Sequence, residues 1–246
     1  REELGAEVTA RRQLRRWGLE ATAGYGFESL TNVGNELTTR ATDDETVRVA
    51  SLNFGLSQDR RDHPLQPRAG WRWFGQVELA DRLLGGEVDY QRWQLGASWH
   101  RELGAGRWLH AGLQHNGVAT FGFDGEVPVN KRFFPGGESS IRGYQSGEAS
   151  PRGADGRFVG AETFMLVNVE VEQALTRRWS LVFFWDGLGM AENLRDYPFD
   201  ESLHSVGLGV RYNTLIGPLR VEYGHNLNPR AGDPDGTLHF SIGVPF

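Results

Sequence analysis

Met165-Leu-Val-Asn-Val-Glu-Val-Glu172 alternates between two kinds of side chain with a period of two residues. Its odd-numbered residues are all apolar, whereas three of its even-numbered residues are polar, namely Asn168, Glu170 and Glu172. Successive side chains of a β-strand point to opposite faces of the sheet, so this spacing predicts a strand with one apolar and one polar face. The same alternation recurs further along the chain, in 179–186, 206–213, 219–224 and 238–246.

The alternation also extends upstream of this stretch. Between residues 92 and 99 every second residue is apolar, at Trp93, Leu95, Ala97 and Trp99, and the residues between them are polar or small. We predict six more strands in this part of the chain, which makes eleven in all. They lie at about 2–14, 17–32, 47–61, 70–84, 88–103 and 107–121.

Strand length distinguishes two all-β architectures that would both alternate in this way. A typical soluble strand has about five or six residues, whereas a tilted strand needs about 9–11 to cross a bilayer. Several of the predicted strands have ten or more residues. The pattern therefore favours an antiparallel transmembrane β-barrel over a water-soluble sandwich. A closed barrel is also the only sheet that satisfies its backbone hydrogen bonds in lipid.

Composition excludes several other classes of protein. The 246 residues contain no uninterrupted apolar run of the roughly 18 residues that a spanning helix needs. The absence of Cys excludes disulfide scaffolds and Cys-ligated metal sites. A formal net charge of -6 argues against a nucleic-acid partner. Because no linker or compositional break divides the chain, we expect one domain over 1–246.

The two strand faces and the connection lengths predict how the barrel sits in its membrane. The apolar face of each strand should meet lipid and the polar face should line the interior. Connections 14–17, 61–70, 103–107, 175–179 and 214–217 are short, whereas 32–47, 121–161, 190–204 and 228–236 are mostly long, with 84–88 as the exception. Outer-membrane barrels have short periplasmic turns, so we expect the short set and the C-terminus to be periplasmic. Aromatic girdles should form near strand ends at Trp71, Trp73, Trp99, Trp179 and Tyr212.

The longest connection, 121–161, contains the most distinctive motif of the chain. It reads Arg132-Phe-Phe-Pro-Gly-Gly-Glu-Ser-Ser-Ile-Arg-Gly-Tyr144. Connections of this length without secondary structure of their own are usually functional or folded inward. The glycines permit tight backbone conformations, and the second arginine presents a rigid fork of donors that suits carboxylates.

This motif resembles the loop-six signature of the outer-membrane assembly-factor superfamily of BamA and TamA type, approximately R-F-F-x-G-G-x-x-S-[VI]-R-G-[FY]. Asp59-Arg-Arg-Asp-His-Pro-Leu-Gln-Pro-Arg-Ala-Gly70 is similar to a turn of the same family, D-x-R-D-x-P-x-x-P-x-x-G. Segments 207–220 and 238–246 resemble the family's last three strands. The resemblance covers about residues 47–246 in detail and the first two strands by pattern alone.

The resemblance implies that the long loop lies between strands eleven and twelve of a sixteen-stranded barrel. Because five predicted strands follow the motif, this chain would be the C-terminal portion of that barrel, about 11 of 16 strands. The first strands and the periplasmic POTRA domains would be absent from it. The family's C-terminal insertion signal would correspond to Phe240, Gly243 and Phe246.

For the site itself, the resemblance implies that the loop folds into the lumen and places Arg142 against acidic residues of the wall. The strand period independently puts Glu170 and Asp186 on the inward face. The alternative is a solvated Arg142 and two carboxylates that merely line a wet lumen. The chain also reads Asp186-Gly-Leu-Gly189 where the family favours D-x-G, so a different local bulge is expected. The loop site would comprise Arg142, Gly143, Tyr144, Glu170 and Asp186, and the rest of the motif Arg132, Phe133, Phe134, Gly136 and Gly137.

By resemblance, the function is non-enzymatic insertion or translocation of β-barrel clients at a bacterial outer membrane or an equivalent organelle membrane, through a lateral seam. Alternatives are a secretion pore of the same superfamily, with a partner or self-secreted passenger, and, less favoured, a porin or an outer-membrane enzyme. Gly137-Glu-Ser-Ser-Ile141 lacks the last glycine of a nucleophile elbow, and the histidines show no ligand spacing, so we assign no catalytic, metal or cofactor site. Expected partners are outer-membrane lipid, unfolded client or secreted proteins, and periplasmic or inner-membrane accessory proteins.

Overall fold

A computed structural model describes residues 2–31, 46–121, 127–196, 199, 201–214 and 217–243. In these residues, eleven antiparallel strands form one sheet in which each strand pairs with its neighbours in sequence. The predicted number of strands is confirmed. The strands are β1 Glu2–Leu14, β2 Leu19–Thr31, β3 Thr46–Asp59, β4 Gly70–Ala80, β5 Tyr90–Gly104, β6 Arg107–Thr120, β7 Thr163–Ala174, β8 Trp179–Ala191, β9 Glu201–Thr214, β10 Gly217–Asn226 and β11 Gly236–Ile242.

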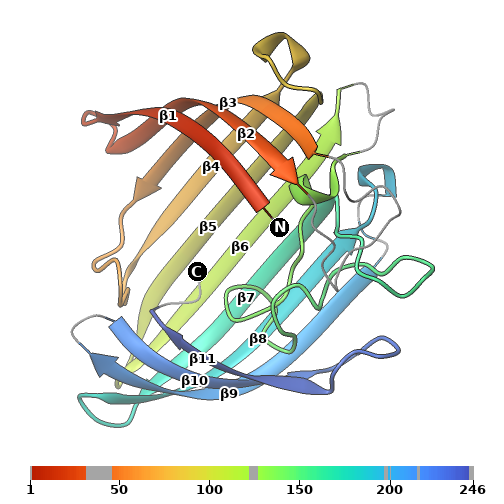
Figure 1. Cartoon of the computed structure of the whole chain (residues 1–246). Coiled ribbons are helices and arrows are strands. Elements are labelled where there is room, and N and C mark those ends of the chain that lie inside the picture. The colour runs from red at the N-terminus through yellow and green to blue at the C-terminus, as the bar shows by residue number, and fades with distance from the viewer. Residues whose placement is uncertain are drawn as a thin grey trace.

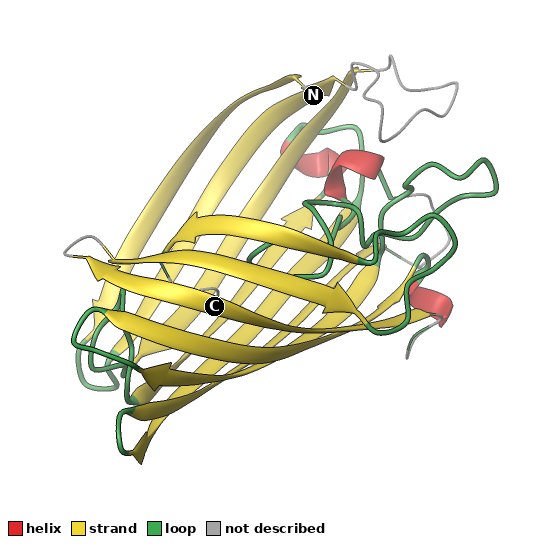
Figure 2. Cartoon of the chain, turned by 90° about the horizontal axis from the view of Figure 1, so that it is seen from below, coloured by secondary structure: helices red, strands yellow, loops and turns green. Residues whose placement is uncertain are grey.

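The sheet is strongly tilted and curls around a hollow interior, with the β6–β7 connection lying inside the curve (Figure 1). The view from below shows the same single layer of strands, with loops filling one side of it (Figure 2). Between described strands the register runs without interruption except for a shift between Glu102 and Gly104. The strand around Asp186 pairs regularly with both neighbours, so no bulge forms there.

Burial alternates along the strands as the sequence predicts. In β10 the side chains of Leu219, Val221 and Tyr223 are exposed on the outer face, whereas Arg220 and Glu222 between them are buried. The same holds in β8, where Phe183 and Trp185 are exposed and their neighbours are buried. The polar faces therefore point into the curled sheet and the apolar faces point out of it.

Two predicted boundaries are wrong by several residues. The strand expected at 70–84 ends at Ala80, because the Asp81 side chain accepts a hydrogen bond from the Leu83 amide and caps a short 3-10 helix, η1 Arg82–Leu84, which Gly85 ends in a left-handed conformation. Strand β9 starts at Glu201, within the connection expected at 190–204. Two further 3-10 turns are η2 Val129–Lys131 and η3 Leu194–Asp196. Among the described residues, no helix is long and apolar enough to cross a membrane.

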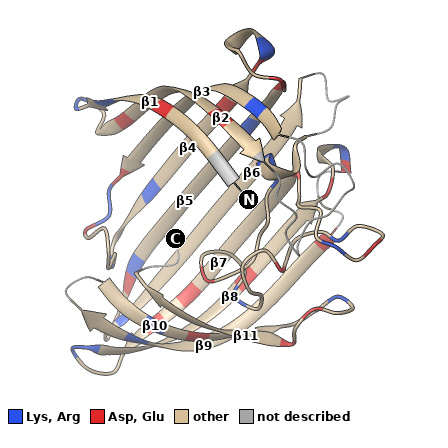
Figure 3. Ribbon diagram, viewed as in Figure 1, with Lys and Arg blue, Asp and Glu red and all other residues tan. Residues whose placement is uncertain are grey.

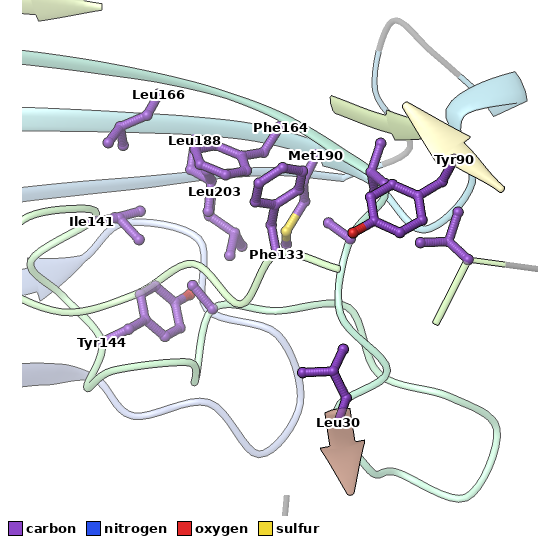
Figure 4. Packing of buried hydrophobic residues seen from close by; sticks show 14 of the residues in the cluster. Leu30, Tyr90, Phe133, Ile141, Tyr144, Phe164, Leu166, Leu188, Met190 and Leu203 are labelled. Atoms are coloured by element: carbon purple, nitrogen blue, oxygen red, sulfur yellow. The ribbon is translucent and has the colours of Figure 1, made fainter. Parts of the chain in front are cut away.

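The apolar core lies between the long loop and the inner face of the sheet, with members on every strand from β2 to β9. Ile141 and Tyr144 of the loop are fully buried there (Figure 4). They belong to a cluster that includes Leu166, Leu188 and Leu203 of the wall. Burial of these side chains stabilises the inward position of the loop, because each removes apolar surface from water.

Candidate functional site

The loop places Arg142 at the centre of a set of carboxylates on the inner wall. The side chain of Arg142 is 0% exposed. Its Nε and Nη2 donate to the two oxygens of Asp186 at 2.8 and 2.7 Å, and its Nη1 donates to Glu170 at 2.9 Å and to Glu222 at 3.2 Å. The backbone amide of Arg142 also donates to Asp186, at 3.1 Å. One loop residue thus binds three strands, β8, β7 and β10.

The surroundings of Arg142 compensate for the removal of its charge from water. Its guanidinium lies 3.5 Å from the ring centroid of Phe184, an arrangement that adds a cation–π contact. Burial alone would lower the pKa of the Arg142 guanidinium, but the charges of Asp186, Glu170 and Glu222 outweigh burial and raise it. Arg142 is therefore a permanent cation, and its geometry is bidentate toward Asp186.

A second buried arginine, Arg211 on β9, extends the network toward the short connections. Its Nη2 donates to Glu170 at 2.9 Å and to Glu222 at 2.8 Å, and its Nη1 lies 3.3 Å from Glu172. We call Arg142, Arg211 and the four carboxylates Glu170, Glu172, Asp186 and Glu222 the lumenal network. It contains two cations and four anions and joins the loop to four consecutive strands.

Sequence reasoning identified Arg142, Glu170 and Asp186 and missed the other three members of the lumenal network, Arg211, Glu172 and Glu222. The structure brings the three expected residues into direct contact, at the distances given above. Arg211 and Glu222 were placed on polar strand faces but were given no role. The sequence did contain a signal, because both residues have inward positions on adjacent strands. Arg211 lies within the family segment 207–220, and Glu222 lies two residues beyond it.

Close approach of the loop backbone to the wall depends on two glycines. A Cβ on Gly143 would lie 1.5 Å from Oδ1 of Asn226, and a Cβ on Gly224 would lie 2.1 Å from the carbonyl oxygen of Arg142. Gly136 and Gly137 have φ values of 129° and 98°, which other residues rarely adopt. Gly143 has no positive φ, so its expected backbone role is corrected to one of close contact.

The same loop segment is bound to the terminal hairpin, which we define as β10, β11 and their connection 227–235. Asn226 Nδ2 and Thr237 Oγ1 donate to the Gly143 carbonyl at 2.9 and 3.0 Å. His239 Nε2 on β11 lies 2.9 Å from the Arg142 carbonyl. The loop backbone therefore contacts both strands of the hairpin.

Tyr144 fixes the tip of the hairpin through Asp233. Its hydroxyl donates to Asp233 at 3.1 Å, and Arg152 and Arg230 donate to the same carboxylate at 2.8 and 2.9 Å. Burial and the adjacent carboxylate raise the pKa of the Tyr144 hydroxyl, so it remains a donor. Asp233 was not predicted, since nothing in its local sequence indicates a contact with a residue 89 positions away.

The first half of the motif lies apart from Arg142 and anchors the stem of the loop. Arg132 donates to the Val127 carbonyl at 3.4 Å. Phe133 pairs with Ala161 through an isolated β-bridge and packs edge-on against Phe164, with ring centroids 5.4 Å apart. Phe134 lies against Gly160, where a Cβ would come within 2.8 Å of its ring. These three motif residues hold the two ends of the loop together.

The expected C-terminal signal is partly described. Phe240 on β11 points outward and is 69% exposed, and Gly243 adopts a φ of 103°. Phe246 lies outside the described residues. In the described part of the chain, no group of three or more His, Cys, Asp or Glu side chains has the geometry of a metal site. His100 and His110 nevertheless meet across β5 and β6, with their Nδ1 atoms 2.8 Å apart, a pairing hidden by their separation in sequence.

A long-stranded antiparallel sheet with an apolar exterior and a loop bound inside it defines a membrane β-barrel protein with an internal loop. The whole chain, residues 1–246, matches the family model described as the Omp85 superfamily domain, and it belongs to that superfamily. The resemblance inferred from the loop motif and the all-β fold class are thereby confirmed.

Curated relatives and a crystal structure agree with this assignment. The chain is 28% identical over 240 residues to the outer membrane protein assembly factor BamA of Nitratidesulfovibrio vulgaris, covering 93% of this chain and 30% of that protein. It is 24% identical over 225 residues to BamA of Neisseria meningitidis, covering 78% and 28%. The crystal structure of BamA from Haemophilus ducreyi lacking POTRA domains 1–3 superposes with a TM-score of 0.81 at 19% identity, over 98% of this chain and 54% of that chain. The chain thus spans less than a third of the length of the two curated relatives.

Proposed function

We propose that this chain is the barrel portion of an outer-membrane assembly factor that inserts β-barrel client proteins without enzymatic chemistry. The observation that carries the proposal is the docked loop, in which Arg142 of the family motif binds Asp186, Glu170 and Glu222 of the wall. The BamA relatives, whose names describe assembly of outer-membrane proteins, support it. Outer-membrane lipid, unfolded clients and accessory proteins of the periplasm or inner membrane are the partners that this function requires.

The proposed mechanism uses the free edge of the terminal hairpin. In the described sheet, β11 pairs with β10 alone, so its other edge presents unpaired backbone donors and acceptors. An extended client segment could add to this edge as a further strand through main-chain hydrogen bonds. The short connections and the C-terminus would face the periplasm, from which clients arrive. In this scheme the lumenal network stabilises the conformation of the wall and the hairpin while a client segment pairs with the β11 edge.

Site-specific photocrosslinking in the full-length protein tests this mechanism. A photoreactive amino acid replaces Phe240 on β11, and a matched one replaces Phe54, which is outward-facing on β3 and far from the edge. We expect nascent β-barrel clients to crosslink at position 240 and not at position 54. Equal crosslinking at both positions, or none at 240 during active client assembly, would contradict a role for the β11 edge.

A secretion pore of the same superfamily is the second candidate, and one observation favours it. A polar cavity of about 610 Å³ runs along the inner face of β1 to β5, beside the volume that the loop occupies. Asn53 and Gln94 are among its lining residues. If the protein secretes a passenger through this space, a photoreactive residue at position 53 should crosslink that passenger. Under the assembly-factor proposal position 53 stays free of translocating protein.

A further inference from the structure

The short-turn end of the sheet has a charge opposite to that of the whole chain. We define the turn end as four of the five short connections with the strand ends beside them, residues 11–20, 58–72, 101–107 and 173–180. It contains twelve arginines and four carboxylates, although the chain as a whole has a net charge of -6. Figure 3 shows blue segments at the β1–β2 tip and along the neighbouring short connections. The arginines are Arg11, Arg12, Arg15, Arg16, Arg60, Arg61, Arg68, Arg72, Arg101, Arg107, Arg177 and Arg178, and the carboxylates are Glu20, Asp59, Asp62 and Glu102.

Most of this positive charge is exposed, and among the described residues ten of the twelve arginines form no ion pair. Arg61 pairs with Asp59 at 2.7 Å, and Arg11 lies 3.4 Å from Glu20. No ion pair of the described residues neutralises the other ten. The exposed arginines of these ten are Arg12, Arg15, Arg16, Arg60, Arg68, Arg101, Arg107, Arg177 and Arg178. A cluster of this kind repels itself unless an external anion balances it.

The densest part of the turn end is the β1–β2 turn, and its backbone is well fixed. Gln58 Nε2 of β3 donates to the Trp17 carbonyl at 2.7 Å. Gly18 adopts a φ of 63°, and the guanidinium of Arg60 lies directly over it, 2.6 Å from where a Cβ would be. Trp17 is 57% exposed, and the Arg16 guanidinium lies 6.0 Å from its ring centroid. We call Arg12, Arg15, Arg16, Trp17 and Arg60 the turn patch.

An aromatic band lies on the outer face of the sheet, at the same end of the strands as the turn patch. Trp71 and Trp99 are register partners on β4 and β5, and both are exposed. Trp179 and Tyr212 are partners on β8 and β9, with ring centroids 4.8 Å apart. Tryptophan and tyrosine side chains gather at membrane–water interfaces, so this band marks the level of the lipid headgroups. Arg101 follows Trp99 by two residues on the same outward face, at the level where headgroup phosphates lie.

We propose that the turn patch binds the phosphate headgroups of anionic phospholipids in the leaflet on the short-turn side. The inference rests on the proposed placement of this chain in a membrane and goes beyond it by naming a lipid class and a site. Clustered arginines beside a membrane attract anionic headgroups, and the guanidinium fork matches phosphate oxygens. Exposed Trp17 among these arginines favours a lipid surface over an acidic protein domain, since indole side chains insert at the interface.

The lipid selectivity of the full-length protein, reconstituted in bilayers, tests directly whether the turn patch binds anionic phospholipids. The probes are spin-labelled phosphatidylglycerol and spin-labelled phosphatidylcholine, whose motionally restricted fractions give a relative association constant. The test variant carries Arg12→Gln, Arg15→Gln and Arg16→Gln. The control variant loses the same charge at the opposite end of the sheet, with Arg82→Gln, Arg157→Gln and Arg195→Gln.

We expect the unaltered protein to prefer phosphatidylglycerol several-fold at low salt and less so at high salt, since screening weakens exposed charges. The test variant should lose most of this preference and the control variant should keep it. An unchanged preference in the test variant would overturn the proposal, as would an equal loss in both variants, which would indicate net charge alone. Absence of any preference in the unaltered protein would also overturn it and would leave a protein partner as the ligand of the patch. Because the readout is lipid association, it can fail while client assembly is intact, which separates it from the proposed function.

Discussion

Arg142 makes five hydrogen bonds to three carboxylates in a site closed to solvent. Two of these bonds use the planar fork on Asp186, and a third and fourth use Nη1 toward Glu170 and Glu222. Removing one member of a buried ion pair typically costs about 3–5 kcal/mol, because the partner charges remain buried and unpaired. Arg142 is therefore the single side chain whose loss should most disturb the loop.

We expect Arg142→Ala in the full-length protein to lower the free energy of unfolding by about 3–5 kcal/mol. Arg142→Lys should recover only part of this, since an ammonium keeps the charge and loses the bidentate geometry. Temperature-dependent gel migration of the folded barrel measures both effects. Arg157→Lys, on an exposed arginine of the same loop, is the control and should behave as the unaltered protein. A fully stable Arg142→Lys variant would show that charge alone suffices.

At the residue scale, side-chain contacts could be predicted from the sequence where they join the loop motif to a regular strand face. Arg142 is marked by its motif, and Glu170 and Asp186 by their inward positions. Asp233 could not be predicted, because its contact with Tyr144 depends on the paths of two irregular segments. The role of Gly143 in close contact with the wall could not be predicted either, since only the position of Asn226 in the structure shows that a side chain at position 143 would clash.

At the scale of elements, adjacent residues on one strand should respond oppositely to charge. Phe54 on β3 points outward and is 47% exposed, whereas Asn53 beside it lines the polar cavity. An arginine on a lipid-facing position at the bilayer midplane costs about 2–4 kcal/mol, whereas a lumenal arginine can be hydrated. Phe54→Arg should therefore reduce folding into lipid vesicles far more than Asn53→Arg. The reverse order would show that the two faces are assigned the wrong way round.

The β3–β4 turn should depend on pH through Asp62. Its Oδ1 accepts hydrogen bonds from the amides of His63, Arg68 and Ala69, at 3.0, 2.9 and 3.1 Å. Slight burial raises the pKa of the Asp62 carboxyl, but the amide donors outweigh burial and hold it below its ordinary value of 3.8. A lowered pKa means that this stabilisation is present above pH 3.8 and is lost as the pH falls through the folded-state value.

We therefore expect Asp62→Asn to be less stable than the unaltered protein at pH 7 and to match it in strong acid, well below pH 3.8. Thermal unfolding of both proteins at the two pH values measures the difference. A stability gap that persists unchanged in acid would mean that the ionised carboxylate is not what holds this turn.

The strands themselves were predictable because a period of two is imposed on every residue of a sheet with unlike faces. Their ends were less so. After Ala80 of β4, Asp81 interrupts the apolar face, and the chain leaves the sheet because the Asp81 cap and Gly85 form a competing local turn. For β9, the first residues include Leu203 and Ser205, whose burial on the inner face reflects contact with the loop.

The interior of the whole molecule is divided between a filled and an open side. The lumenal network occupies the inner face of β7 to β10, and the long loop packs beside it and against one end of β2 to β6. The rest of the inner face of β1 to β5 borders the polar cavity. Lys131 at the base of the loop binds Glu28 and Glu78, so the loop also touches the open side at its rim. The order of strands follows from sequential hairpins, but the inward path of the loop was inferred only through a family resemblance.

In this arrangement the loop stabilises the terminal hairpin. It contacts the terminal hairpin through Gly143, the Arg142 carbonyl and Tyr144. Its contacts with β2, β4 and β5 are made nearer its base, by Lys131 and Phe133. If Arg142 maintains this arrangement, weakening its contacts should make the terminal hairpin less stable and leave the strands far from the hairpin unchanged. A destabilisation spread evenly over the sheet would instead indicate a general loss of folding.

Amide hydrogen exchange of the full-length protein in lipid tests this claim most directly. In Arg142→Lys we predict faster exchange in the terminal hairpin, residues 217–242, and in the loop at 132–161, with exchange in β2 to β5 unchanged from the unaltered protein. Unchanged exchange in the hairpin, together with faster exchange confined to the loop, would contradict the account, because it would show that the loop does not hold the hairpin in place.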